Sequence, residues 1–492
     1  MKRRLPILLG LALLCANPIV TAQTTRNSVS YSLADRGGTT FSTAGGGGEV
    51  TVGYARVQPG SGTTAPAGVA IFGYRANGVL VTEAGVPVMQ PILSGRSYAE
   101  ANGPVNTGLA FANPNSFAVT ISYYFTSQAG VTTSQSSFTL NAGEQMARFI
   151  HEAPFSVAGV FAGTFTFSAS APVGVISLRG LTNDRDEFLI TTQTVASITT
   201  SSTASLVMAH FADGGGWKTQ IILVNSSDQL ISGNVLFYGE GSGSVAATPL
   251  TLTLNGQVGV SFNYAIPGRA SVKLETSGAG STTQVGSLLV TPNAGSDSPS
   301  GFTLFSLTSN GTIVTQASVS AEPATTASRM YVETSGTAGS SGSIQSGIGI
   351  TNTSTTTTTV SFELMTLAGA STGLRGQITI PGNGHAAKFL LELFPGLPLS
   401  FKGVLRISSG SPLVVVGLRT RYNERGDFLI TTTPASSEFS TTTTTDVIFP
   451  HIVDMGGYTT QFALFSGTQS QSAIGTVRFF TQTEQAMNVT VQ

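Results

Sequence analysis

The chain has 492 residues, of which 58 are glycine, 40% are hydrophobic and only 10% are charged, whereas about 25% of the residues in typical soluble proteins are charged. Its 23 basic and 24 acidic side chains give a formal net charge of -1, which excludes the basic surface that a nucleic-acid partner requires. The apolar fraction is too high for a disordered chain. The length predicts several domains, each with its own hydrophobic core.

The first 22 residues have the pattern of a secretory signal peptide. Three basic residues at 2–4 precede an apolar run at 8–14, and Val20–Ala22 supplies the short side chains of a cleavage site. We therefore expect a secreted protein that acts in the extracellular space or at the cell surface. The only cysteine, Cys15, lies inside this peptide, so the mature chain has no thiol for a disulfide, a metal site or catalysis. No later segment has the roughly 18 continuous apolar residues of a membrane span.

After the signal peptide the sequence repeats itself with a period of about 235 residues. Tyr31 recurs as Tyr264 at a shift of 233, and the run Phe188–Thr192 recurs as Phe428–Thr432 at a shift of 240. Serine- and threonine-rich segments lie at matching places, 198–205 and 433–445. Such segments are typical of flexible linkers between packed units.

Each period divides again into two related halves. One segment with apolar residues at alternate positions occurs four times, as Thr107–Asn113, Thr219–Asn225, Ser346–Asn352 and Thr460–Ser466. Short strands separated by Asn-Gly and Gly/Ser turns about every ten residues are typical of antiparallel sandwiches. We therefore predict an all-β fold of tandem immunoglobulin-like antiparallel β-sandwiches.

Two further patterns are expected within the domains. The segments Gly163–Gly180 and Gly403–Thr420 each predict a strand, a Gly/Ser turn and a second, apolar strand. The segments Glu144–Ala153 and His385–Leu393 have apolar residues on one helical face. We therefore expect one short helix in some of the domains.

The repeat sets the expected domain borders. In chain order we expect the signal peptide (1–22), a half sandwich (23–95), a sandwich of type 2 (99–196), a complete sandwich of type 1 (206–321), a second sandwich of type 2 (329–436) and a final half sandwich (447–492). The first half sandwich matches only the second half of type 1, and the last matches only its first half. The break corresponds to the hairpin turn at 254–257, and removing 22 residues from 492 leaves 470, which is two periods.

Half a sandwich leaves an apolar face and unpaired strand edges exposed, so the two halves are expected to find partners. Three arrangements fit: a head-to-tail filament resembling donor-strand assembly, an intramolecular ring, and a truncated chain or independent C-terminal cap. The residues that we expect at the assembly interface are Val29, Tyr31, Leu33, Met487, Val489 and Val491.

No catalytic constellation is visible in the sequence, so we expect no enzyme, no cofactor and no metal site. The GxSxG pattern at 369–373 falls between two predicted strands rather than on the strand-to-helix elbow of a hydrolase. The RGD tripeptide at 425–427 fits a polar turn before a strand. His210 and His451, each followed three residues later by aspartate, fit a hydrogen-bonded histidine beside an Asp-Gly turn better than a metal site.

Two aromatic residues beside glycine pairs, Trp217 and Tyr458, are the candidate ligand contacts, because an exposed ring there could stack on a sugar. Packing over a domain joint is the alternative. The strings Asp213–Gln220 and Arg421–Phe428 resemble those of uncharacterised immunoglobulin-like sandwich repeats in secreted bacterial proteins. That resemblance implies an extracellular β-protein and no particular ligand.

The sequence therefore favours a non-enzymatic structural subunit. We expect it to self-associate head-to-tail into an extracellular filament or surface layer. The alternative is a monomeric or ring-closed adhesin or carbohydrate-binding module with a surface glycan as its partner.

Overall fold

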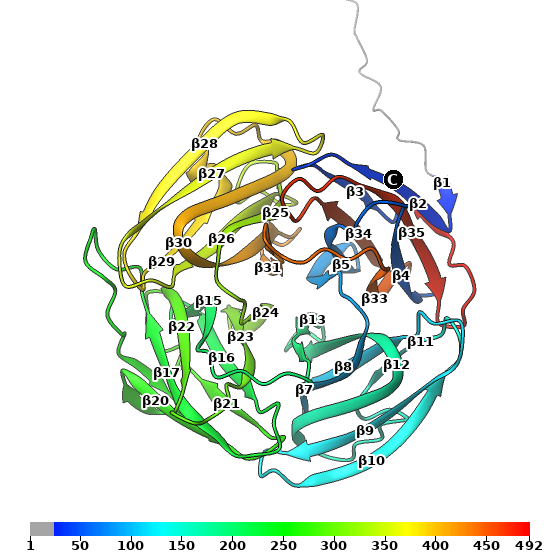
Figure 1. The fold of residues 1–492 in the computed structure, drawn as a ribbon, viewed down its shortest axis with the longest axis horizontal. Coiled ribbons are helices and arrows are strands. Elements are labelled where there is room, and N and C mark those ends of the chain that lie inside the picture. The colour runs from blue at the N-terminus through cyan, green and yellow to red at the C-terminus, as the bar shows by residue number, and fades with distance from the viewer. Residues whose placement is uncertain (1–23) are drawn as a thin grey trace, which may run out of the picture.

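The computed structural model describes residues 24–492, and the predicted signal peptide lies outside them. In the described residues every strand ladder is antiparallel, and the one helix is α1 (Leu390–Leu393). The expected all-β, antiparallel fold is confirmed. The strands gather around four hydrophobic cores, and we name the four groups units 1 to 4. Figure 1 shows the units side by side in a ring, with the first and last strands of the chain in the same quarter.

Unit 1 combines the two ends of the chain in two four-stranded sheets, ordered β2-β35-β4-β33 and β3-β34-β5-β6, plus the pair β1-β36. Its strands are β1 (Thr24–Arg26), β2 (Ser28–Leu33), β3 (Gly38–Ser42), β4 (Thr51–Pro59), β5 (Ala67–Ala76), β6 (Val79–Pro87), β33 (Val447–Asp454), β34 (Tyr458–Phe465), β35 (Ala473–Thr481) and β36 (Val489–Val491).

Unit 3 has the same arrangement in one continuous stretch, with sheets β15-β22-β17-β20 and β21-β16-β23-β24 and the hairpin β18-β19. Its strands are β15 (Leu206–Asp213), β16 (Trp217–Val224), β17 (Ile231–Tyr238), β18 (Leu252–Leu254), β19 (Gln257–Gly259), β20 (Ser261–Ile266), β21 (Ser271–Glu275), β22 (Gln284–Pro292), β23 (Ser300–Ser309) and β24 (Thr312–Ser320).

Units 2 and 4 are each built on one eight-stranded sheet. Unit 2 contains β7 (Ile92–Asn102), β8 (Val105–Ala112), β9 (Val119–Ser127), β10 (Thr132–Leu140), β11 (Gln145–Phe149), β12 (Phe161–Thr182), β13 (Phe188–Gln193) and β14 (Val195–Ala196). Unit 4 contains β25 (Thr325–Ser335), β26 (Ile344–Asn352), β27 (Thr358–Thr366), β28 (Ser371–Ile380), β29 (His385–Phe389), α1, β30 (Ser400–Tyr422), β31 (Phe428–Thr433) and β32 (Ser436–Ser437).

The strand-turn-strand prediction for two segments is wrong, because each forms one long strand, β12 or β30. In β12 the pairing register with β7 shifts between Ser168 and Val173. The first part of the strand pairs with β7 and β9, and the second part pairs with β8 and β13. Pro172 has no N–H to donate, so a bulge at this place bends the strand without ending it.

The helix prediction is correct only for α1 in unit 4, because residues 385–389 of the segment His385–Leu393 form strand β29. Residues 145–149 of the segment Glu144–Ala153 form strand β11, which pairs with β8, and a turn follows. Ile150 is fully buried there. Apolar residues in a short strand and its following turn can satisfy a helical spacing over so few residues, which explains the error.

The four related segments end in similar loop caps. The side-chain amides of Asn113, Asn225 and Asn352 each donate to three backbone carbonyl groups at 2.6–3.2 Å. In the fourth segment Ser466 takes this place, and its Oγ donates to the carbonyl of Gln471 at 2.9 Å. The equivalent loop of each of the four units is therefore held in a similar way, by side-chain hydrogen bonds to its backbone.

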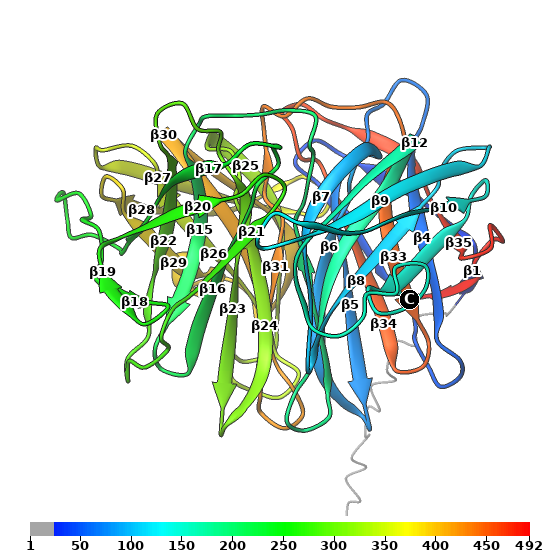
Figure 2. The same ribbon diagram turned by 90° about the horizontal axis from the view of Figure 1, so that it is seen from below.

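The inner strands β6, β13, β24 and β31 lie next to one another around the ring axis, and Figure 2 shows β6, β24 and β31 running along it. Side-chain hydroxyls join them where no regular ladder forms. Thr82 Oγ1 donates to the carbonyl of Ile190 (3.3 Å) and accepts its N–H (3.2 Å). Thr315 and Ile430 make the same pair of bonds at 3.2 and 3.0 Å. These bonds satisfy backbone groups that burial would otherwise leave unpaired.

Candidate functional site

The two ends of the chain form a closing seam in unit 1, made by ladders between strands more than 350 residues apart. Strand β2 pairs with β35, β4 lies between β33 and β35, and β34 lies between β3 and β5. The half units thus complete each other within this one chain, and residues 447–492 do not form a separate cap.

The structure brings all six predicted assembly residues into the unit 1 core. Tyr31, Leu33, Met487 and Val489 are buried, while Val29 and Val491 are half-buried and pack against them. Their burial explains why the termini cannot be separated without exposing apolar surface. Each fully buried side chain of this size contributes about 1.5–3 kcal/mol.

The seam replaces a hairpin that is continuous in unit 3. There β18 and β19 pair Leu254 with Gln257 across the turn Asn255-Gly256, whose φ angles of 49° and 79° are left-handed. In unit 1 the corresponding pair is Val491 with Thr24. The chain ends therefore meet where the related unit has a two-residue turn.

Buried ion pairs mark the joint between units 2 and 3. Glu100, which is 3% exposed, accepts from Arg179 at 2.8 Å and from Lys273 at 2.7 Å. Burial alone would raise the pKa of Glu100, but the two cations outweigh burial and lower it. The carboxylate therefore stays ionised inside the joint.

The joint between units 4 and 1 has the same design. Arg419 lies 2.8 Å from Glu333 and 3.3 Å from Glu83. Burial would raise the pKa of Glu333, but Arg419 and Lys402 outweigh burial and hold the pKa at about 2. Breaking such a pair leaves a buried charge uncompensated, so these joints resist opening.

The other two joints contain buried histidines. Between units 1 and 2, His451 Nδ1 lies 3.4 Å from Nε2 of Gln145. Between units 3 and 4, His210 Nδ1 lies 3.2 Å from Nε2 of His385, the residue that corresponds to Gln145. Burial lowers the pKa of His210 and of His451 to about 4, so both rings are neutral at pH 7.

The predicted ligand contacts, Trp217 and Tyr458, both lie half-buried at joints of the histidine type. The Trp217 ring packs against Phe305 and Phe428, with centroids 5.6 and 6.3 Å away. Tyr458 stacks on Tyr74 at 4.5 Å. The structure does not bring the two residues together, because each belongs to a different half of the ring.

The RGD tripeptide lies in a network that sequence reasoning did not anticipate. Arg425 pairs with Glu187 at 2.5 Å, and Asp427 pairs with Arg185 at 3.1 Å. These reciprocal pairs join equivalent turns of units 2 and 4, which are opposite each other in the ring. The only available signal was the 240-residue repeat that relates Arg185 to Arg425.

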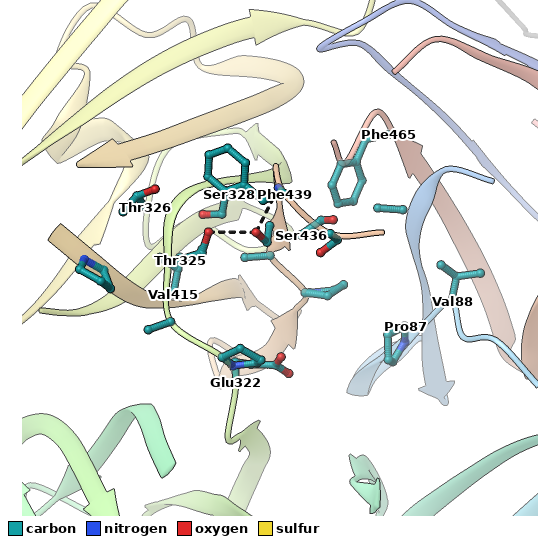
Figure 3. Close-up of a pocket in the computed structure, with 18 of the residues that line it drawn as sticks. Pro87, Val88, Glu322, Thr325, Thr326, Ser328, Val415, Ser436, Phe439 and Phe465 are labelled. Carbon is teal, nitrogen blue, oxygen red and sulfur yellow. Dashed lines mark hydrogen bonds between the residues drawn. The ribbon is translucent and has the colours of Figure 1, made fainter. Parts of the chain in front are cut away.

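A hollow of about 740 Å³, the joint hollow, lies between units 4 and 1 beside the linker into β25 (Figure 3). Its lining is rich in proline and hydroxyl side chains, and its one charged residue is Glu322. Ser437 Oγ lies 2.9 Å from Thr325 Oγ1 and accepts the N–H of Phe439 at 3.2 Å. The Phe439 side chain is 60% exposed. The hollow therefore combines an exposed ring, a carboxylate and several hydroxyls.

Among residues 24–492, no group of three or more His, Cys, Asp or Glu side chains is placed to hold a metal ion. None of the helices in that range has the length and apolar character needed to cross a membrane.

No family model and no curated protein matches the chain. Among solved structures, that of Thermotoga maritima 1070 aligns with 24% of this chain and 97% of its own, at 14% identity and a TM-score of 0.20. The structure of the infectious bursal disease virus Gt strain aligns with 96% of this chain and 82% of its own, at 8% identity and a TM-score of 0.10. Similarities this low carry no argument about fold or function.

Proposed function

We propose that the protein is a secreted, non-enzymatic adhesin that acts as a closed ring of four immunoglobulin-like β-sandwiches and binds a surface glycan. The observation that carries this proposal is the joint hollow. Its exposed Phe439 ring can stack on the apolar face of a sugar. The Glu322 carboxylate can accept hydrogen bonds from sugar hydroxyls, and the Ser and Thr hydroxyls can accept or donate them. Ligand sites between domains are common, and the buried ion pairs keep this joint rigid.

Glycan-array binding tests the proposal. Phe439→Ala should reduce array binding several-fold, up to about tenfold, since a stacked ring contributes about 0.5–1.5 kcal/mol, and Glu322→Gln should change the ranking of the glycans bound. Phe117→Ala is the matched control, because that ring is 57% exposed in unit 2, away from the hollow. Failure of the wild-type protein to bind any glycan, or equal loss in the control, would refute the proposal.

Head-to-tail assembly is the second candidate, and the complementarity of the two half units favours it. The ladders that close unit 1 within one chain can also form between chains by exchange of identical strands. Residues 447–492 of one subunit would then complete the half unit formed by residues 24–87 of the next subunit, giving a filament or surface layer.

Engineered disulfides separate the two arrangements. Ser30 and Thr476 are paired across β2 and β35, so Ser30→Cys with Thr476→Cys gives an intrachain disulfide in a closed ring and covalent multimers in a filament. Asn263→Cys with Asn234→Cys is the matched control, because this equivalent pair lies within unit 3 and stays intrachain either way. We expect a monomer band on a non-reducing gel. A ladder of multimers from the first pair alone would favour the filament.

A further inference from the structure

A second cavity, of about 330 Å³, lies in the joint between units 1 and 2, and we name it the aromatic pocket. Its walls include the rings of Phe149, Phe188 and Tyr458 and the aliphatic side chains of Leu109 and Leu178. The volume is at the lower end of the range for small-molecule sites. The pocket shares no lining residue with the joint hollow.

The related joint between units 3 and 4 indicates what fits such a space. There Phe428, the counterpart of Phe188, lies against the indole ring of Trp217. In unit 1 the counterpart of Trp217 is Tyr458, which stacks on Tyr74 instead. Phe188 in turn packs edge-on against Phe149 at 5.9 Å. An indole ring thus lies against Phe428 in the joint between units 3 and 4, whereas a cavity lies beside Phe188 in the joint between units 1 and 2.

Gly180 helps to explain the difference between the halves. Its counterpart in unit 4 is Thr420. A Cβ atom on Gly180 would lie only 2.6 Å from two ring carbons of Phe188. The glycine therefore allows Phe188 to lie over the strand and form one wall of the pocket.

A positively charged side chain, that of Arg148, lies at the edge of the aromatic pocket. Arg148 lines the pocket and is exposed, and its side chain donates a hydrogen bond to the carbonyl of Ala147. Its counterpart Lys388 is instead 3.5 Å from Glu392. The carboxylate of Glu152 also lines the pocket, but it accepts the N–H of Phe149 at 2.7 Å. The guanidinium is therefore the group available to an anionic ligand.

We propose that the aromatic pocket binds a small planar aromatic carboxylate of one or two fused rings. The ring lies between Phe149, Phe188 and Tyr458, and the carboxylate faces Arg148. This site is separate from the proposed glycan site and does not depend on it.

Calorimetric titration of the full mature chain with 2-naphthoate tests the proposal. We expect one site per chain. Ala147→Phe, which fills the pocket from strand β11, should weaken binding more than tenfold. Arg148→Gln should weaken binding of 2-naphthoate about tenfold while leaving binding of the neutral 2-naphthalenemethanol unchanged. Lys388→Gln, the matched change in the other half, should alter neither.

Circular dichroism of each variant confirms that the fold is retained. Absence of 2-naphthoate binding by the wild-type chain would overturn the proposal, as would binding that a folded Ala147→Phe variant preserves. Equal effects of Arg148→Gln and Lys388→Gln would show that the carboxylate does not face Arg148. Because Phe439 is outside the pocket, failure here and failure of the glycan proposal are distinguishable.

Discussion

At the scale of single residues, the ring depends on buried polar groups that bond across the joints. Arg96, which is 2% exposed, is an example that the sequence analysis missed. Its guanidinium donates to Thr166 Oγ1 and to the carbonyl of Asn225, each at 2.7 Å, and so joins unit 2 to unit 3. A lone arginine in a strand gives no signal of burial, since most arginines are exposed. Its recurrence as Arg329 after 233 residues was the available clue.

The buried histidines predict a loss of stability in mild acid. His451 has a folded-state pKa of about 4, against an ordinary value of 6.5, because burial disfavours its charged form. Between these values the unfolded chain binds more protons, so the stabilising contribution is complete above pH 6.5 and is lost as the pH falls towards 4. We expect the free energy of unfolding of the wild type to fall by about 2 kcal/mol more than that of His451→Gln between pH 7.5 and 4.5.

Urea denaturation at the two pH values measures this difference. His210→Gln serves as the comparison in the other half of the ring, where burial also lowers the pKa to about 4. His210→Gln should remove a similar share of the pH dependence of the free energy of unfolding. If the free energy of unfolding changed by the same amount between the two pH values in the wild type and in both variants, the assignment of neutral, buried histidines would be contradicted.

At the scale of elements, the strands were predictable and their continuity was not. The alternation in Thr219–Asn225 is local, and the structure places these residues in β16 and its loop cap. Whether Pro172 ends a strand or bends it depends on partners on both sides, β7 before it and β8 after it. The exposure of Trp217 likewise depends on Phe428 in the neighbouring unit. Local patterns carry no information about such distant contacts.

The whole molecule is a ring with its chain break placed in a hairpin. The sequence predicted that the half units are complementary, but complementary ladders are the same within one chain and between two. Proximity favours closure within one chain, because joining the strands within a chain turns pairing into an intramolecular step with a high effective concentration. This effective concentration is a property of the folded ring, and no single segment of the sequence indicates it.

A circular permutant tests this view of the ring. Val491 would be joined to Thr24 by Asn-Gly, as in the turn of unit 3, and the chain would be opened between Asn255 and Gly256. Because only the connection of two equivalent hairpins changes, we expect the same circular dichroism spectrum and a melting temperature within a few degrees of the wild type. A permutant opened between Phe305 and Ser306, inside β23, should fail to fold. Equal folding of both, or of neither, would contradict the prediction.

The pairing of β1 with β36 also sets the direction in which the molecule is mechanically weak. Thr24 and Val491 are partners at the same end of an antiparallel ladder. A force that pulls these two residues apart therefore acts on one rung at a time and unzips the seam towards Arg26 and Val489. A force applied between units 2 and 4 instead acts together on the ion pairs and the side-chain hydrogen bonds that join the units. The protein should thus yield under tension across its own chain ends before it yields anywhere else.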